Sequence, residues 1–238
     1  MIAYYPYYIE PARYVVENFV APTLNLHSED NCIDFFAGGS CPETYGIFQA
    51  LQNIFYDNAD ITIFDEENGW FPYQKTTWSL CSEIFAEQDV RSYTFAHRRC
   101  RIGKDFADDL DFVGRLKKTK IFFLQNYLSH MSDKPESVEK FLNWFSAVTK
   151  QTTSAAFFIL IDLNYNSVAT VFRRLVDENF LQTNSLKKIA AHIPDDGEPL
   201  TIRHGDTLQS LRDNIFDDND GLKQKKNTNF YFVVLQKI

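Results

Sequence analysis

The sequence predicts one α/β domain of the doubly wound kind, in which helices cover both faces of a mostly parallel sheet. Short apolar runs, typical of buried strands, alternate along the chain with segments whose apolar residues recur at helical spacing. Such alternation favours parallel strands joined by helical crossovers. The 238 residues contain neither an internal repeat nor a linker long enough to separate two domains. We therefore expect a single domain over residues 1–238, with a tyrosine-rich helical extension at 1–30.

The first half of the chain opens with the tyrosine-rich stretch and continues with three strand patterns. Pro6 and Pro11 interrupt the opening stretch, so its helix is expected only from residue 12 onward. The first strand pattern, at 32–36, is apolar except for Asp34. Expected strands lie at 32–36, 61–64 and 93–96, and expected helices at 12–20, 44–55, 76–86 and 105–116.

The second half repeats the alternation and contains the two most apolar strand patterns. The runs 121–124 and 157–161 are continuously apolar, as a strand buried on both faces requires. Residues 183–220 carry no clear helix or strand pattern. Expected helices lie at 137–148 and 167–179, and a last strand at 230–235.

Composition and charge exclude several classes of protein. Apolar residues make up 45% of the chain, which suffices for a sizeable core and argues against disorder. The net charge of −8 disfavours non-specific binding to nucleic acid, although a local basic patch can still hold one specific RNA. No apolar run approaches the roughly 18 residues of a membrane helix, so we expect a soluble protein with no membrane partner.

The four cysteines lie far apart and lack the spacing of a zinc site, so no metal is expected. No secretory signal precedes them. Reduced thiols and a cytoplasmic location are therefore the expectation.

A glycine loop follows the first strand pattern and precedes a helix pattern. Gly38 and Gly39 allow a sharp turn and a close approach of the backbone to a ligand. The unpaired N–H groups of the following helix point back toward this loop. Asp65 closes the second strand pattern, where its carboxylate can accept hydrogen bonds from ribose hydroxyls. These residues predict a nucleotide site at two neighbouring strand ends.

Glu43, in the first turn of the helix after the loop, bears on the kind of ligand. A carboxylate there repels a pyrophosphate but attracts a cation, which favours a ligand with an ammonium or sulfonium group. The alternative is that Glu43 only complements the helix dipole. A dinucleotide oxidoreductase is further disfavoured because the loop lacks the G-x-G-x-x-G spacing.

The stretch from Phe36 to Gly46 resembles the F-G-G-G-P-G-[ST]-[DE]-x-x-G loop of class I S-adenosylmethionine-dependent methyltransferases, in a branch that includes ribosomal-RNA uridine methyltransferases. Asp65 followed by Trp70 and Trp78 is similar to the D-x(n)-W-x(n)-W stretch of that branch. The resemblance implies a Rossmann-like fold with an antiparallel last strand and S-adenosylmethionine as the cofactor. For the two tryptophans, packing in the core is expected over stacking on a base.

The resemblance also implies the site residues. Asn126 and Tyr127 follow the fourth strand, where Asn126 would orient the acceptor and Tyr127 would pack against it; alternatively, both only close the strand end. For Asp34, structural hydrogen bonding is as good an interpretation as a cofactor contact. The residues implied in cofactor binding are Asp34, Ala37, Gly38, Gly39, Glu43 and Asp65.

The expected function is methyl transfer to RNA or another nucleotide-containing acceptor, and this expectation is compatible with a protein partner. Ala37 and Cys41 replace loop glycines of the family, which motivates the alternative of a catalytically inactive binding or scaffold protein. A basic stretch at 97–101, together with Lys104, offers contacts to RNA phosphates. The interpretation favoured for this stretch is a solvated loop beside acidic neighbours.

Overall fold

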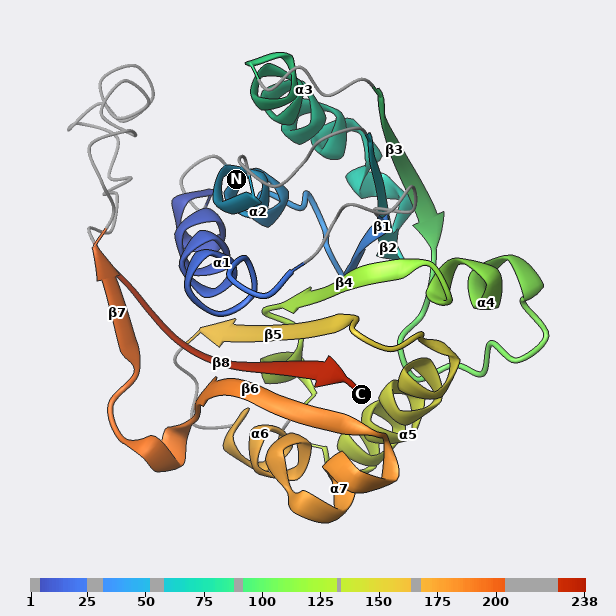
Figure 1. The fold of residues 1–238 in the computed structure, drawn as a ribbon, viewed down its shortest axis with the longest axis vertical. Coiled ribbons are helices and arrows are strands. Elements are labelled where there is room, and N and C mark those ends of the chain that lie inside the picture. Colours follow the sequence, from blue (N-terminus) through green and yellow to red (C-terminus); the bar gives the residue numbers. More distant parts are fainter. Residues whose placement is uncertain are drawn as a thin grey trace.

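A single sheet with helices on both faces forms the centre of the molecule (Figure 1). The computed structural model describes residues 5–24, 32–51, 58–87, 92–131, 134–163, 168–203 and 227–238. The strands are β1 (Cys32–Phe36), β2 (Asn58–Asp65), β3 (Ser92–Arg99), β4 (Thr119–Gln125), β5 (Phe157–Leu163), β6 (Leu186–His192), β7 (Leu200–Arg203) and β8 (Asn227–Lys237). The helices are α1 (Tyr5–Phe19), α2 (Glu43–Leu51), α3 (Phe71–Glu87), α4 (Leu110–Leu116), α5 (Pro135–Gln151), α6 (Ala169–Val176) and α7 (Glu178–Thr183).

The strand order confirms the predicted fold class. The order is β3-β2-β1-β4-β5-β8-β6, with β7 paired to the first residues of β8. The first five strands in this order are parallel to one another, whereas β8 runs antiparallel to both β5 and β6. Because β1 lies between β2 and β4, the chain leaves β1 in one direction and later returns to its other side. This switch point is where parallel α/β sheets place their ligands, beyond the carboxyl ends of the strands.

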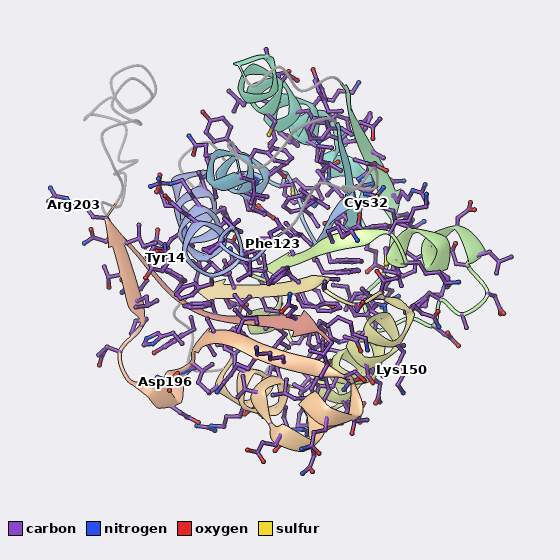
Figure 2. All side chains as sticks on the ribbon, viewed as in Figure 1. Tyr14, Cys32, Phe123, Lys150, Asp196 and Arg203 are labelled. Carbon is purple, nitrogen blue, oxygen red and sulfur yellow. The ribbon has the colours of Figure 1, made fainter. Side chains whose placement is uncertain are left out.

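Two apolar layers, one on each face of the sheet, form the core. Helices α1, α2 and α3 cover one face, and α4, α5, α6 and α7 cover the other (Figure 1). Phe123 of β4 belongs to the first layer, and Figure 2 labels it on the side of β4 that faces α1 and α2. Phe122 and Phe158 stack in the second layer, with ring centroids 4.7 Å apart. Consecutive phenylalanines in a strand point to opposite faces of the sheet. Because helices cover both faces, consecutive positions in these strands are apolar.

Several predicted elements are confirmed with shifted ends, and others are corrected. Helix α1 begins at Tyr5 and runs through Pro11, because its packing against α2 and the sheet outweighs the missing backbone hydrogen bond. The single helix predicted at 167–179 is two helices, since Asp177 is extended and caps α7 by accepting hydrogen bonds from the backbone of Asn179 and Phe180. Strands β6 and β7 lie in the region for which no pattern was recognised.

Gly46 determines how closely α1 and α2 pack. A Cβ at this position would overlap the backbone carbonyl oxygen of Ile9 and lie 3.2 Å from the backbone nitrogen of Arg13. Only glycine allows α1 to cross α2 at this distance. The last glycine of the loop pattern therefore acts on helix packing and not on the loop itself.

Within the described ranges, no helix combines the length and the apolar character that crossing a bilayer demands.

Candidate functional site

The glycine loop and Asp65 meet at the carboxyl ends of β1 and β2, as the sequence predicted. The backbone N–H of Gly39 donates to Oδ2 of Asp65 at 2.9 Å, and the N–H of Glu67 donates to Oδ1 at 2.8 Å. Asp65 is buried. Each of its carboxylate oxygens therefore has one donor from the protein and keeps a second lone pair. The carboxylate holds the loop in place and also stands beside any ligand that the loop binds.

Helix α3 fixes the other side of the loop. The Gln74 side-chain nitrogen donates to the carbonyl oxygen of Gly39 at 2.7 Å, and the Thr77 hydroxyl donates to the carbonyl of Ser40 at 2.9 Å. His97 of β3 lies behind Gln74, with its Nδ1 3.1 Å from the Gln74 Oε1. Gln74 is fully buried, so its amide orientation is fixed by these two partners. These residues were not predicted, because their spacing along the chain gives no signal.

At positions 37 and 41, where the family pattern has glycine and this chain does not, the backbone has a conformation that favours glycine. Ala37 and Cys41 have φ of 50° and 54°, in the left-handed region. A Cβ at Gly38 would lie 2.9 Å from Cγ2 of Ile63, so a larger residue does not fit there. Because a side chain disfavours this region, each of the two residues strains the loop by about 1–2 kcal/mol.

Asp34 is not in this site, and its predicted cofactor contact is corrected. Its carboxylate is fully buried within β1 and accepts a hydrogen bond from Nε of Arg115 at 2.8 Å and another from the hydroxyl of Thr119. Arg115 also pairs with Asp60 of β2. Burial raises the pKa of Asp34 to about 6, against the lowering effect of Arg115. The structure therefore shows Asp34 in structural hydrogen bonding, the other of the two interpretations that the sequence allowed.

Glu43 begins α2 directly after the loop and is buried, with 3% of its surface exposed. Burial raises the pKa of Glu43 to about 8, hydrogen bonds from its own backbone and from Cys41 lower it in part, and the Asp65 carboxylate raises it. Glu43 is therefore largely protonated at neutral pH. A cation beside it would favour the charged form and release this proton, which is how the predicted contact to an ammonium group would act.

The substitution Glu43→Gln is expected to remove a pH-dependent loss of stability. The folded-state pKa lies above the reference value of 4.5, so stability falls as the pH rises from about 4.5 through 8. Urea unfolding measures the free energy of unfolding at pH 6 and pH 8.5. Between these pH values, the free energy of unfolding of the glutamine variant should rise by roughly 2 kcal/mol relative to that of the wild type. Glu136→Gln, an exposed carboxylate in the first turn of α5, is the control; an equal pH dependence for both variants would contradict the assignment.

The ends of β4 and β5 carry buried polar atoms without partners. Asn126 has φ of 58°, and its Oδ1 accepts the backbone N–H of Leu163 at 3.2 Å. Its Nδ2 is buried, as are Oε1 of Gln125 and Oδ1 of Asp162, and none of the three has a hydrogen-bond partner among the described residues. The other oxygen of Asp162 accepts the backbone N–H of Ser129 at 3.0 Å. Unpaired buried polar atoms at strand ends are typical of a ligand site or of bound water.

An open cleft of about 1250 Å³ adjoins the ends of β2, β3 and β4. Glu66 and Tyr127 line it, together with the segment 98–109 and residues of α5. Burial and the neighbouring Glu66 raise the pKa of the Tyr127 hydroxyl. Tyr127 therefore lines the same cleft as the carboxylate that directly follows Asp65, whereas Asp65, Asn126 and the glycine loop do not line it. The described residues contain no group of three or more His, Cys, Asp or Glu side chains that could hold a metal ion.

The two tryptophans pack within the protein. Trp78 stacks on Phe95 of β3 with ring centroids 5.1 Å apart, as part of the core layer under α3. The ring of Trp70 lies over the loop, 3.7 Å from the position of a Cβ on Gly39. Trp78 thus follows the expected core packing, whereas Trp70 also covers the glycine loop.

Comparison with known proteins bears on the fold. No family model and no curated protein matches the sequence. Among solved structures, the citrinin polyketide synthase CMeT domain is similar, with a TM-score of 0.51 and 10% identity over 96% of this chain and 52% of that one. The plantazolicin methyltransferase in complex with SAH (TM-score 0.49, 10% identity, 98% and 85% covered) and an S-adenosylmethionine-dependent methyltransferase from Clostridium acetobutylicum ATCC 824 (0.46, 10%, 97% and 92%) also match.

This protein has the mixed α/β, Rossmann-like fold of the CMeT domain, with a mostly parallel sheet and antiparallel last strands. The chain spans about half the length of the polyketide synthase chain that it matches. At this level of identity the likeness concerns the fold, and the chemistry has to be argued from the residues at the strand ends.

Proposed function

We propose that the protein is a methyltransferase that uses S-adenosylmethionine and acts on RNA or another nucleotide-containing acceptor. The observation that carries the proposal is the contact between Gly39 and Asp65, which joins a turn of exposed backbone and a carboxylate at the switch point of the sheet. A carboxylate at this position suits ribose hydroxyls. The proposal places the reaction inside the cell, where the cofactor is made.

The residues at the strand ends fit the parts of this cofactor. Asp65 keeps free lone pairs for the ribose, and Glu66, one oxygen of which lies 3.5 Å from Arg101, offers a second carboxylate that lines the cleft. The unpartnered acceptor on Gln125 and donor on Asn126 are the two kinds of group that an ammonium and a carboxylate require. Glu43 adds a buried carboxyl that becomes charged when a cation lies near it.

The bound cofactor would supply an activated methyl group, so the protein needs no covalent nucleophile. Its own part is to hold the acceptor in line and to exclude water. The Asn126 Nδ2 carries two hydrogens, so one would contact the cofactor and the other would orient the acceptor, against which Tyr127 would pack.

Calorimetry with S-adenosylhomocysteine tests the cofactor. We expect Asp65→Ala to weaken binding by about 1.5–3 kcal/mol, the value of a hydrogen bond to a charged group. Because Asp65 also holds the loop, Glu66→Gln is the cleaner variant, with an expected loss of about fivefold to tenfold in affinity. Glu67→Gln changes an exposed neighbouring carboxylate outside the cleft lining and should bind as the wild type does.

The outcomes separate the two candidate functions. No binding by the wild type at millimolar ligand would overturn the cofactor proposal. Binding that is weakened in Glu66→Gln and kept in Glu67→Gln supports it. Binding without methyl transfer to any RNA or nucleotide would favour the alternative of an inactive binding protein, which the strained loop at Ala37 and Cys41 motivates.

A further inference from the structure

The cleft carries a group of cations that the proposed transfer step does not use: Arg98, Arg99, Lys104 and Lys140. All four side chains are exposed. None of them forms an ion pair with another described residue. The sequence showed only part of this group, because Lys140 comes from α5, far along the chain.

Three of the four carboxylates of the cleft, by contrast, have partners, and Asp108 is the fourth. Glu66 lies 3.5 Å from Arg101. Asp105 accepts the backbone N–H of Ala107 at 3.0 Å, and Asp109 caps α4 by accepting the N–H of Phe112 at 3.0 Å. Five cations and four carboxylates line the cleft, so its formal charge is +1 in a chain of −8. Glu66 and Arg101 pair with each other, which leaves four cations against three carboxylates, two of which already accept backbone hydrogen bonds.

The position of these cations links them to the candidate cofactor site. In the pairing of β2 with β3, Arg99 lies opposite Asp65, and the N–H of Cys100 donates to the carbonyl oxygen of Asp65 at 3.0 Å. The basic segment thus starts at the strand end that carries the candidate ribose carboxylate. Gly103 brings the segment against α5, because its Cβ position lies 3.7 Å from Cβ of Lys140. Two separate parts of the chain therefore direct cations toward one cleft.

We propose that Arg98, Arg99, Lys104 and Lys140 bind phosphate groups of the methyl acceptor, in the cleft that Glu66 and Tyr127 also line. The proposal rests on the proposed function in calling this ligand the acceptor. Arginine offers several donors in a planar fork that suits phosphate oxygens, and lysine adds a compact point charge. A free nucleotide and an RNA strand share this chemistry. A basic cleft also lets a specific anion bind to a protein whose overall charge would repel it.

Fluorescence anisotropy with a short labelled single-stranded RNA of mixed sequence tests the site. We expect the double variant Arg98→Gln/Arg99→Gln to bind about tenfold more weakly or worse, and Lys104→Gln/Lys140→Gln to behave likewise. The dependence of affinity on salt should become shallower by about 0.7 in logarithmic slope for each phosphate that the variant no longer neutralises. The control is Lys187→Gln/Lys188→Gln, an equal change of charge on exposed residues of β6, at the opposite edge of the sheet from β3.

A nucleoside monophosphate added as competitor distinguishes the two sources of phosphate. Displacement of the RNA at millimolar nucleotide indicates that a single phosphate fills the site, and persistence of the complex indicates a phosphodiester chain; both support the proposal. It is overturned if neither ligand binds or if the control double variant loses as much affinity. Calorimetry with S-adenosylhomocysteine on the same variants keeps the two proposals apart. Cofactor binding without anion binding would overturn only the inference about the cations. Anion binding without cofactor binding would overturn only the proposal that the protein uses S-adenosylmethionine.

Discussion

Arg115→Leu is expected to destabilise the protein by about 3–5 kcal/mol, the usual result of leaving one member of a buried ion pair without its partner. Arg115 is almost fully buried, and it joins α4 to Asp34 of β1 and to Asp60 of β2. Without the guanidinium, the hydrogen bond from Thr119 is the only one that the described residues give to the side chain of the fully buried Asp34. Urea unfolding of the wild type and the variant measures the loss.

The pH dependence of that loss has a definite sign. Burial already raises the pKa of Asp34 to about 6, and removal of Arg115 raises it further. A raised carboxyl pKa makes folding less favourable as the pH rises. The difference in the free energy of unfolding between the wild type and the Arg115→Leu variant should therefore be smaller at pH 5 than at pH 8. Asp34→Asn in the same chain should restore part of the stability.

Arg174→Leu provides the comparison for Arg115→Leu. Arg174 lies 2.7 Å from Glu139 with about half of each side chain exposed, and such surface pairs contribute less than about 1 kcal/mol. Equal losses for the two leucine variants would mean that the buried pair does not hold the strands together.

The difference between Asp34 and Asp65 shows how far the sequence can lead. Both are acidic residues in apolar strands, and the family pattern allowed a ligand contact for each. Asp65 ends its strand, where the sheet opens to a ligand, whereas Asp34 is the third of the five residues of β1. A carboxylate in the interior of a central strand needs a buried cation, and the cation that serves it comes from α4, at a distance in sequence that no local pattern reveals.

The elements that were predicted well are those whose signal is local. Strand β1 has the predicted ends, and the continuous apolar runs of β4 and β5 mark the centre of the sheet. Strands β6 and β7 were missed because they lie at the sheet's edge, where side chains are half exposed and apolar alternation is weak. The basic stretch was interpreted as a solvated loop, but residues 97–99 end β3, and their neighbours form a cleft wall.

Gly46→Ala is the second change with a large expected effect, because it adds a single methyl group where α1 crosses α2. The new Cβ would overlap the carbonyl oxygen of Ile9, which is backbone and cannot rotate away as a side chain can. The two helices must then separate, and we expect a loss of about 3 kcal/mol, at the upper end of what overpacking costs. Gly114→Ala is the matched control, since no atom lies within 4 Å of its Cβ position in α4; there the better helix propensity of alanine should add up to about 1 kcal/mol.

The same chemical change should therefore have opposite signs at the two glycines, as measured by urea unfolding, and the Gly46 variant should also affect the site. Helix α2 starts directly after the glycine loop, and the loop is fixed to α3 through Gln74 and Thr77. If α2 is pushed outward while α3 stays, Gly39 shifts relative to Asp65, and the affinity for S-adenosylhomocysteine should fall with the stability. A variant that loses stability but binds the ligand unchanged would show that the position of the loop does not depend on how α1 packs against α2.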